Sequence, residues 1–424
     1  MKKILSEDNL INFITILFCI IPIGLITGPF LPDLFLTIII FIFIFLIIKN
    51  KKIDYIKNRY FITFLFFCIT ISIISLFSIN VLPSIKNSLT YIRFGLFVIA
   101  TIYILEKRPN IIKYLKIIFI FIFFTLAVDT IFQLVFSVNI LGQSYNNINN
   151  FRLTSFFGDD EVLGSYVARF FPLVIFLMLY NKSKTDFFSH YYFKILIIIL
   201  SFTIVLLSGE RTSLALICLN IIILFIASKN LRKIIFISGI ICLVVSSIAI
   251  FSDKRIKDRM ITTTINQLGL TTESDRIVIF SEIYEGHYKI SLKMFNEKPL
   301  FGHGVKMFRY YCSKPENFVS NNACSTHPHN FYAQMLSELG LFGFIILTLI
   351  FLYISWLIIK NSYYSIFKKK EILTTASVCL LSCYFINLFP FLPSGNLFNN
   401  WLSILMYYPL GFLMYLIKIK KFYV

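Results

Sequence analysis

Long runs of apolar residues, interrupted by short segments that carry most of the charges, dominate this chain of 424 residues. The hydrocarbon core of a bilayer is about 30 Å thick, and roughly 20 residues of helix cross it. Twelve runs come close enough to that length to predict spanning helices. Their approximate limits are 10–26, 34–48, 60–77, 89–105, 117–136, 162–180, 191–207, 212–227, 234–251, 339–359, 372–392 and 397–417. The pattern therefore predicts an all-α, polytopic membrane protein.

Composition narrows the class of protein further. Hydrophobic residues make up 58% of the chain and charged residues only 14%, with a mean hydropathy of +0.80. A soluble domain has about 25% charged residues, so a soluble enzyme is excluded. Disordered chains are poor in aromatic residues, whereas this chain has 49 Phe and 23 Tyr, so disorder is excluded as well.

The basic residues give an independent prediction of topology, because short loops rich in Lys and Arg stay on the cytoplasmic side. With both termini placed in the cytoplasm, the cytoplasmic segments hold 24 of the 40 basic residues. The short outside loops hold only Lys86, Arg152 and Arg211. Most of the basic residues behind the net charge of +19 thus lie in predicted cytoplasmic segments, and no nucleic-acid partner is expected.

This topology divides the chain into three parts. Residues 1–251 form predicted spans one to nine, residues 252–330 form a long periplasmic loop with amphipathic helices, and residues 331–424 form spans ten to twelve. The loop contains four of the five histidines, and an amphipathic stretch at 275–295 is compatible with a position on the membrane surface. A smaller outside loop runs from 137 to about 161. Chemistry is expected on this outer side.

The cysteines divide between the membrane and the long loop. Six lie in apolar runs, where a thiol ordinarily serves packing. Cys312 and Cys324 lie in the loop, and an oxidising periplasm would allow them to form a disulfide, with two free thiols as the alternative.

Two arginines are candidates for binding an anion. Arg211 follows a tight outside turn at the bilayer surface, and a guanidinium fork bonds phosphate bidentately at any working pH. A snorkelling arginine, or one paired with Glu210, is the alternative. Arg276 opens the amphipathic stretch and is the second candidate, with Asp275 as an alternative structural partner.

Histidines at the end of the loop are candidates for acid–base chemistry. His327 and His329 flank Pro328 just before the tenth span, which holds an imidazole at the membrane interface. A neutral imidazole can remove a proton from a sugar hydroxyl that attacks an activated anomeric carbon. The alternatives are a metal site and, for Asn330, a helix cap. A metal would need further ligands such as His287 or His303 without a recognisable metal spacing, so no metal is expected.

Three charged residues fall inside predicted spans, where charge is costly and often marks function. They are Arg93, Asp129 and Arg169. Mutual pairing across the bundle is the simpler expectation.

At these residues the chain resembles the O-antigen ligase and O-antigen polymerase superfamily of bacterial envelope enzymes. The resemblance is carried by Ser-Gly-Glu-Arg-Thr-Ser at 208–213 and by Pro-Leu-Phe-Gly-His-Gly at 299–304. The third motif is His329-Asn330, nine residues, and then Gly-Leu-Phe-Gly at 340–343, which is similar to the ligase signature.

The resemblance implies a fold, a reaction and a set of site residues. Such enzymes have twelve helices in a GT-C-like arrangement, with the large periplasmic loop between helices nine and ten. They sit in the bacterial inner membrane and move glycan from undecaprenyl diphosphate to an acceptor without metal or cofactor. The catalytic histidine falls on His329 and the diphosphate-binding arginines fall on Arg211 and Arg276. His327, Asn330 and His303 are expected to support them.

The acceptor and one rival class stay open at this point. Ligases use a lipid A-core acceptor, whereas polymerases extend another lipid-linked repeat with the same base and anion clamp. The third motif favours the ligase. A lipid-linked glycan transporter or flippase is the rival, but carriers usually have paired halves and midplane sites, which this chain does not suggest.

Overall fold

The computed structural model describes residues 6–145, 151–180, 187–267 and 280–424. Helices make up nearly all of the regular structure, and no β-strand occurs within these described ranges. The all-α class predicted from the sequence is confirmed. The N-terminal half contains α1 (Glu7–Gly24), α2 (Phe30–Lys49), α3 (Arg59–Ser75), α4 (Val81–Thr90), α5 (Ile92–Lys107), α6 (Ile111–Phe136), α7 (Leu163–Leu179), α8 (Tyr191–Leu207) and α9 (Arg211–Ala227). The C-terminal half contains α10 (Arg232–Ser252), α11 (Lys254–Lys257), α12 (Thr263–Gln267), α13 (Glu282–Glu297), α14 (Phe308–Cys312), α15 (Phe331–Phe367), α16 (Thr375–Asn387) and α17 (Asn400–Lys418).

Each of the twelve apolar runs coincides with an apolar helix. Seven helical segments are long and apolar enough to cross a membrane, and five more apolar helices are shorter, with 10–17 residues. The chain is thus a multi-pass membrane protein. The count of twelve crossings and the side on which each loop lies stay predictions.

The packing fits a bundle surrounded by lipid. α7 lies at the centre, with nearly all of its side chains buried, whereas α2, α6 and α10 turn large apolar side chains outward. Phe41, Phe121 and Leu243, for example, are each 65% or more exposed. Aromatic rings fill the interior, as where Phe18 of α1 stacks on Tyr408 of α17 at 4.5 Å. Exposure of such an apolar outer surface to water would be unfavourable, whereas contact with lipid would not.

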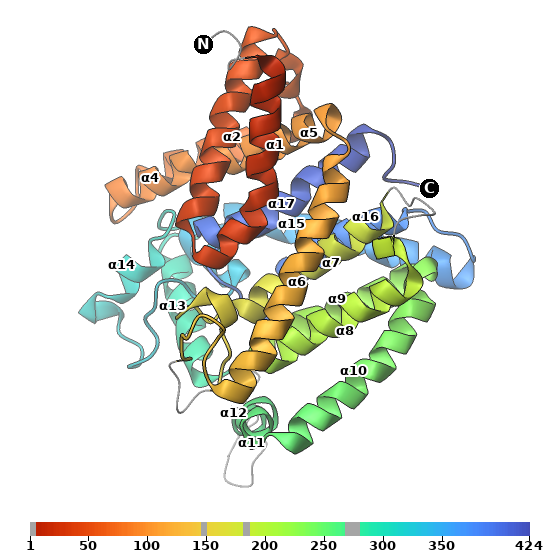
Figure 1. Ribbon diagram of the computed structural model, residues 1–424. Coiled ribbons are helices and arrows are strands. Elements are labelled where there is room, and N and C mark those ends of the chain that lie inside the picture. Colours follow the sequence, from red (N-terminus) through yellow and green to blue (C-terminus); the bar gives the residue numbers. More distant parts are fainter. Residues whose placement is uncertain (1–5, 146–150, 181–186, 268–279) are drawn as a thin grey trace.

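The segment 280–330 forms a small unit at one side of the bundle. Figure 1 shows α13 and α14 together there, with α4 nearby. A separate hydrophobic cluster of Ile290, Met294, Phe308 and Tyr311 forms its core. A disulfide joins Cys312 to Cys324, whose Cα atoms are 5.2 Å apart.

The two glycine motifs noted in the sequence pack on each other. α15 is kinked at Gly340, which has φ +63°, and Gly302 has φ +66°. The backbone nitrogens of Leu341 and Gly304 donate to the carbonyls of Pro299, at 2.8 Å, and Glu338, at 2.8 Å. These bonds fix the loop to the start of α15, immediately beyond the segment that carries His329.

Replacing Gly340 with Ala is expected to destabilise the fold. An added Cβ would lie 2.5 Å from the carbonyl carbon of Leu300, and the left-handed backbone alone costs about 1–3 kcal/mol in a residue other than glycine. Thermal unfolding in detergent should show a lower midpoint. Gly239→Ala in α10 is the matched control, because nothing lies within 4 Å of its added Cβ. Equal midpoints for both variants would contradict this account of the kink.

Candidate functional site

Three imidazole rings gather where the loop meets α15. The ring of His329 lies 4.1 Å from that of His327 and 5.2 Å from that of His287, measured between ring centroids. His287 comes from α13, so the cluster joins the loop to the membrane bundle. The ring of Tyr284, one turn earlier on α13, contacts His329 at 5.7 Å.

Local backbone structure holds His329 in place. Its φ of +53° is unusual for a residue with a side chain, and its carbonyl accepts a hydrogen bond from the backbone N–H of Ser394 at 2.9 Å. Asn330 follows as the N-cap of α15 and accepts bonds from the N–H groups of Tyr332 and Ala333. Its amide also donates to the carbonyl of Pro390 at 2.8 Å. The cap predicted for Asn330 is confirmed, and this cap orients the histidine before it.

Burial keeps the three imidazoles neutral. Burial is the main cause that lowers the pKa of His329 below the ordinary 6.5. Burial and the neighbouring His329 lower the pKa of His287 to about 4 and that of His327 to about 3. A neutral imidazole has a free lone pair, so each ring can accept a proton.

The lowered pKa predicts the pH dependence of any reaction that uses His329 as a base. A base whose pKa is lowered stays unprotonated further into acid, so kcat/KM should stay level from pH 8 down to the ordinary histidine value of 6.5 and fall only below it. A pH profile of the purified protein measures this. An acid limb centred above pH 6.5 would contradict the assignment.

The second part of the candidate site contains Arg211, which is the first residue of α9. Its guanidinium donates to Thr264 at 3.2 Å and to Gln267 at 2.7 Å, which are both neutral acceptors. Glu210 is not its partner. That carboxylate instead accepts the backbone N–H groups of Gly164, at 2.6 Å, and Ser165, at 3.0 Å, at the start of α7. The alternative of an arginine paired with Glu210 is therefore wrong, because the Glu210 carboxylate binds the N-terminus of α7.

Two further arginines join Arg211. Arg152 and Arg259 both lie within electrostatic range of Arg211. Burial, followed by the charges of Arg152 and Arg211, lowers the pKa of Arg259 to about 10. Its Nε donates to the carbonyl of Gly209 at 3.1 Å, and Arg152 pairs with Glu161. Three guanidiniums thus lie near two described carboxylates, those of Glu161 and Glu210, an arrangement that favours an anion.

Sequence reasoning did not single out Arg152 or Arg259. Arg152 counted only as a charge in the smaller outside loop, and Arg259 lay in a long loop without a motif around it. The carbonyl of Gly209, in the Ser-Gly-Glu-Arg turn, receives the Arg259 bond. No spacing rule along the chain could have revealed that contact between residues 50 positions apart.

Tyr284 connects the arginines to the histidines. It lies within electrostatic range of Arg211 and Arg259, and its ring contacts that of His329. Tyr284 thus neighbours both Arg211 and His329, two of the residues predicted from the sequence.

The other predicted residues are placed differently. Arg276 lies outside the described residues. His303 belongs to the small core of the loop, where its Nε2 is bonded to the Met294 carbonyl at 2.9 Å and its ring contacts Tyr311. In the described parts of the chain, no group of three or more His, Cys, Asp and Glu side chains is arranged to hold a metal ion.

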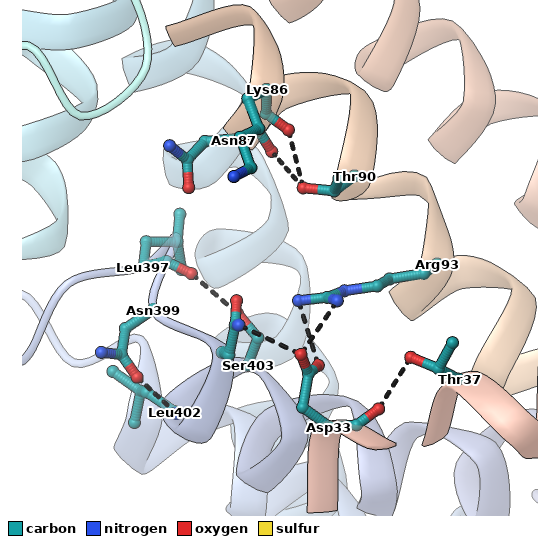
Figure 2. A network of polar contacts seen from close by, with 11 residues as sticks. Asp33, Thr37, Lys86, Asn87, Thr90, Arg93, Leu397, Asn399, Leu402 and Ser403 are labelled. Carbon is teal, nitrogen blue, oxygen red and sulfur yellow. Dashed lines mark hydrogen bonds and ion pairs between the residues drawn. The ribbon is translucent and has the colours of Figure 1, made fainter. Parts of the chain in front are cut away.

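The charges inside the bundle do not pair with one another, so that expectation is wrong. Figure 2 shows Arg93 of α5 pointing at Asp33 of α2, with nitrogen–oxygen distances of 3.0 and 3.1 Å. Arg169 donates to Asn387 at 2.7 Å, and Asp129 accepts from the backbone N–H of Ile140 at 2.7 Å. Each charge thus has a neighbour from a different element, and Asp129 holds the segment that follows α6.

Comparison with known proteins agrees with the motifs. Residues 196–348 match the family model described as O-antigen ligase. This stretch contains Arg211, Arg259, Tyr284 and all three clustered histidines, and it ends just beyond the kink at Gly340. No curated protein matches the chain. The resemblance to the O-antigen ligase superfamily is confirmed at family level.

Proposed function

Since residues 196–348 match the family model described as O-antigen ligase, we propose that the protein transfers glycan from undecaprenyl diphosphate to a lipid A-core acceptor on the periplasmic side of the inner membrane. His329 is the general base. Arg211, Arg152 and Arg259 hold the diphosphate, together with Arg276. One observation carries the proposal. The guanidiniums of Arg211 and Arg259 and the neutral imidazole of His329 share one neighbour, Tyr284, and Arg152 lies within electrostatic range of both arginines.

The proposed reaction is a displacement at the anomeric carbon of the donor sugar. The acceptor hydroxyl oxygen attacks that carbon, its proton passes to the imidazole of His329, and the bond from the carbon to the phosphate oxygen breaks. The diphosphate leaves with the electron pair. Charge grows on this leaving group in the transition state, so nearby guanidiniums stabilise it more than the ground state. The base keeps the attacking oxygen from accumulating positive charge.

In this proposal, protein side chains supply both elements of catalysis, and the reaction needs no metal. Adding a chelator to the purified protein should therefore leave transfer unchanged. Activity that disappears with chelator and returns with a divalent cation would contradict this part.

Deletion of the gene tests the acceptor, with lipopolysaccharide separated on a gel. Loss of a ligase removes all polymer from the lipid A-core, whereas loss of a polymerase leaves a single repeat attached. The proposal expects the first pattern. Net movement of lipid-linked glycan across vesicles without acceptor would instead favour a transporter.

A further inference from the structure

A second pair of basic side chains lies at the opposite end of the row of rings. The rings of Tyr284 and His327 both contact that of His329, and the arginines described above lie at the Tyr284 end. Arg309 of α14 lies within electrostatic range of His327, and Lys306 lies within range of Arg309. The proposed function uses neither residue.

Among the described residues, neither the ammonium of Lys306 nor the exposed guanidinium of Arg309 makes an ion pair. Glu338 lies within electrostatic range of Lys306. Its carboxylate and that of Asp33 are, however, occupied by other bonds. Glu338 accepts the backbone N–H of Lys306 at 2.9 Å, that of Phe308 at 3.3 Å and the side chain of Gln334 at 3.0 Å. Asp33 is held by Arg93 and Asn400.

The backbone at Lys306 is held in a strained conformation. Its φ of +60° is rare for lysine, and the bond from its N–H to Glu338 holds that conformation. Burial, and next the charge of Arg309, lower the pKa of Lys306 below its ordinary value. A half-buried ammonium beside another cation is costly, and a bound anion would offset that cost.

An apolar groove lies a few residues earlier on the same segment. It has a volume of about 570 Å³ and is lined mainly by Ile73, Ile74 and Phe77 of the α3 region and by Leu300 and Phe301. Gly304, between the groove and Lys306, packs tightly on Ser78, which precedes α4, and on Ser84 of α4. One stretch of chain therefore runs from an apolar groove, past two cations, toward the histidines.

We propose that Lys306 and Arg309 bind a phosphate of the acceptor, a phosphorylated glycolipid whose hydrocarbon chain occupies the groove. This inference rests on the proposed function and assigns the acceptor its own anion site, separate from that of the donor. An amphiphile held in this way has its apolar part against α3 and its headgroup beside the cations. Its sugar hydroxyl can then reach His329 from the side opposite the donor diphosphate.

A transfer assay with purified components tests the inference. The acceptor is lipid A-core, used either intact or after phosphatase treatment, and the donor is undecaprenyl diphosphate-linked glycan. For the double variant Lys306→Gln, Arg309→Gln, we expect the KM for intact acceptor to rise at least about tenfold, because charge-assisted bonds to phosphate are lost. The KM for the donor should stay unchanged. Lys289→Gln, which removes an exposed lysine of α13, should change neither value.

The treated acceptor makes the test specific to phosphate. With it, the wild-type protein and the double variant should have the same acceptor KM. If the double variant keeps the wild-type KM for intact acceptor, or raises it equally for both acceptors, the inference is wrong while the proposed function stands. If the wild-type protein transfers no glycan, the proposed function itself fails. Size-exclusion chromatography in detergent, with fluorescence detection, confirms that each variant is folded.

Discussion

Replacing His329 with Ala is expected to lower the rate of glycan transfer by about 10²–10⁴-fold, the usual contribution of a positioned general base. The loss should appear in kcat, because the histidine acts on the acceptor proton in the transition state. Binding of the donor should change little, since the proposal assigns the diphosphate to the arginines and not to His329. The measurement is transfer in purified membranes, with the amount of inserted protein held equal.

His190→Ala is the control for the His329 variant. His190 precedes α8 at the end of the molecule predicted to be cytoplasmic, and its ring contacts only Phe187 among the described rings. The His190→Ala substitution removes an imidazole and leaves the candidate site unchanged. If His329→Ala retains most of its transfer while the protein is folded, the general-base assignment is wrong.

Replacing Arg259 with Gln is expected to weaken donor binding by about 10- to 100-fold. A hydrogen bond to a charged group contributes about 1.5–3 kcal/mol, and the diphosphate would lose one of the guanidiniums proposed to hold it. Arg259→Lys should recover part of the affinity, because it keeps the charge but not the planar fork. The measurement is the Kd for undecaprenyl diphosphate.

Two comparisons separate this role from a structural one. Arg255→Gln, four residues earlier, removes an arginine that is already paired with Asp253 at 2.7 Å, and it should leave the Kd unchanged. Raising the salt concentration should weaken donor binding less in Arg259→Gln than in the wild-type protein, because fewer cations contact the phosphate. A Kd for Arg259→Gln equal to that of the wild-type protein would contradict the three-arginine site.

The sequence predicted the parts of this molecule that depend on local pattern. Apolar run length gave the helices of the bundle, and the histidine before the tenth run lies at the centre of the candidate site. Asn330 was predicted as a helix cap because capping needs only a few adjacent residues. The kink of α15 at Gly340 was not predicted, although its glycine belonged to a motif noted in the sequence.

The sequence could not predict contacts that only the packed fold creates. Arg259 and Arg211 lie 48 positions apart, and their approach depends on how the segment after α10 folds back over the start of α9. Glu210 seemed a natural partner for Arg211 next to it, yet the backbone N–H groups at the start of α7 bind its carboxylate instead. For the charged residues inside the bundle, helix packing likewise determines which residues lie next to them, as with Arg93 and Asp33 (Figure 2).

Parallel measurement of donor binding and of transfer in two variants tests the central claim most directly. That claim is that one anion site and one base meet at Tyr284. For His329→Ala, the account predicts a wild-type Kd for undecaprenyl diphosphate and almost no transfer. For Arg211→Gln, it predicts a Kd raised at least about tenfold and a correspondingly lower kcat/KM. Wild-type donor affinity in Arg211→Gln, together with full transfer in His329→Ala, would contradict the account.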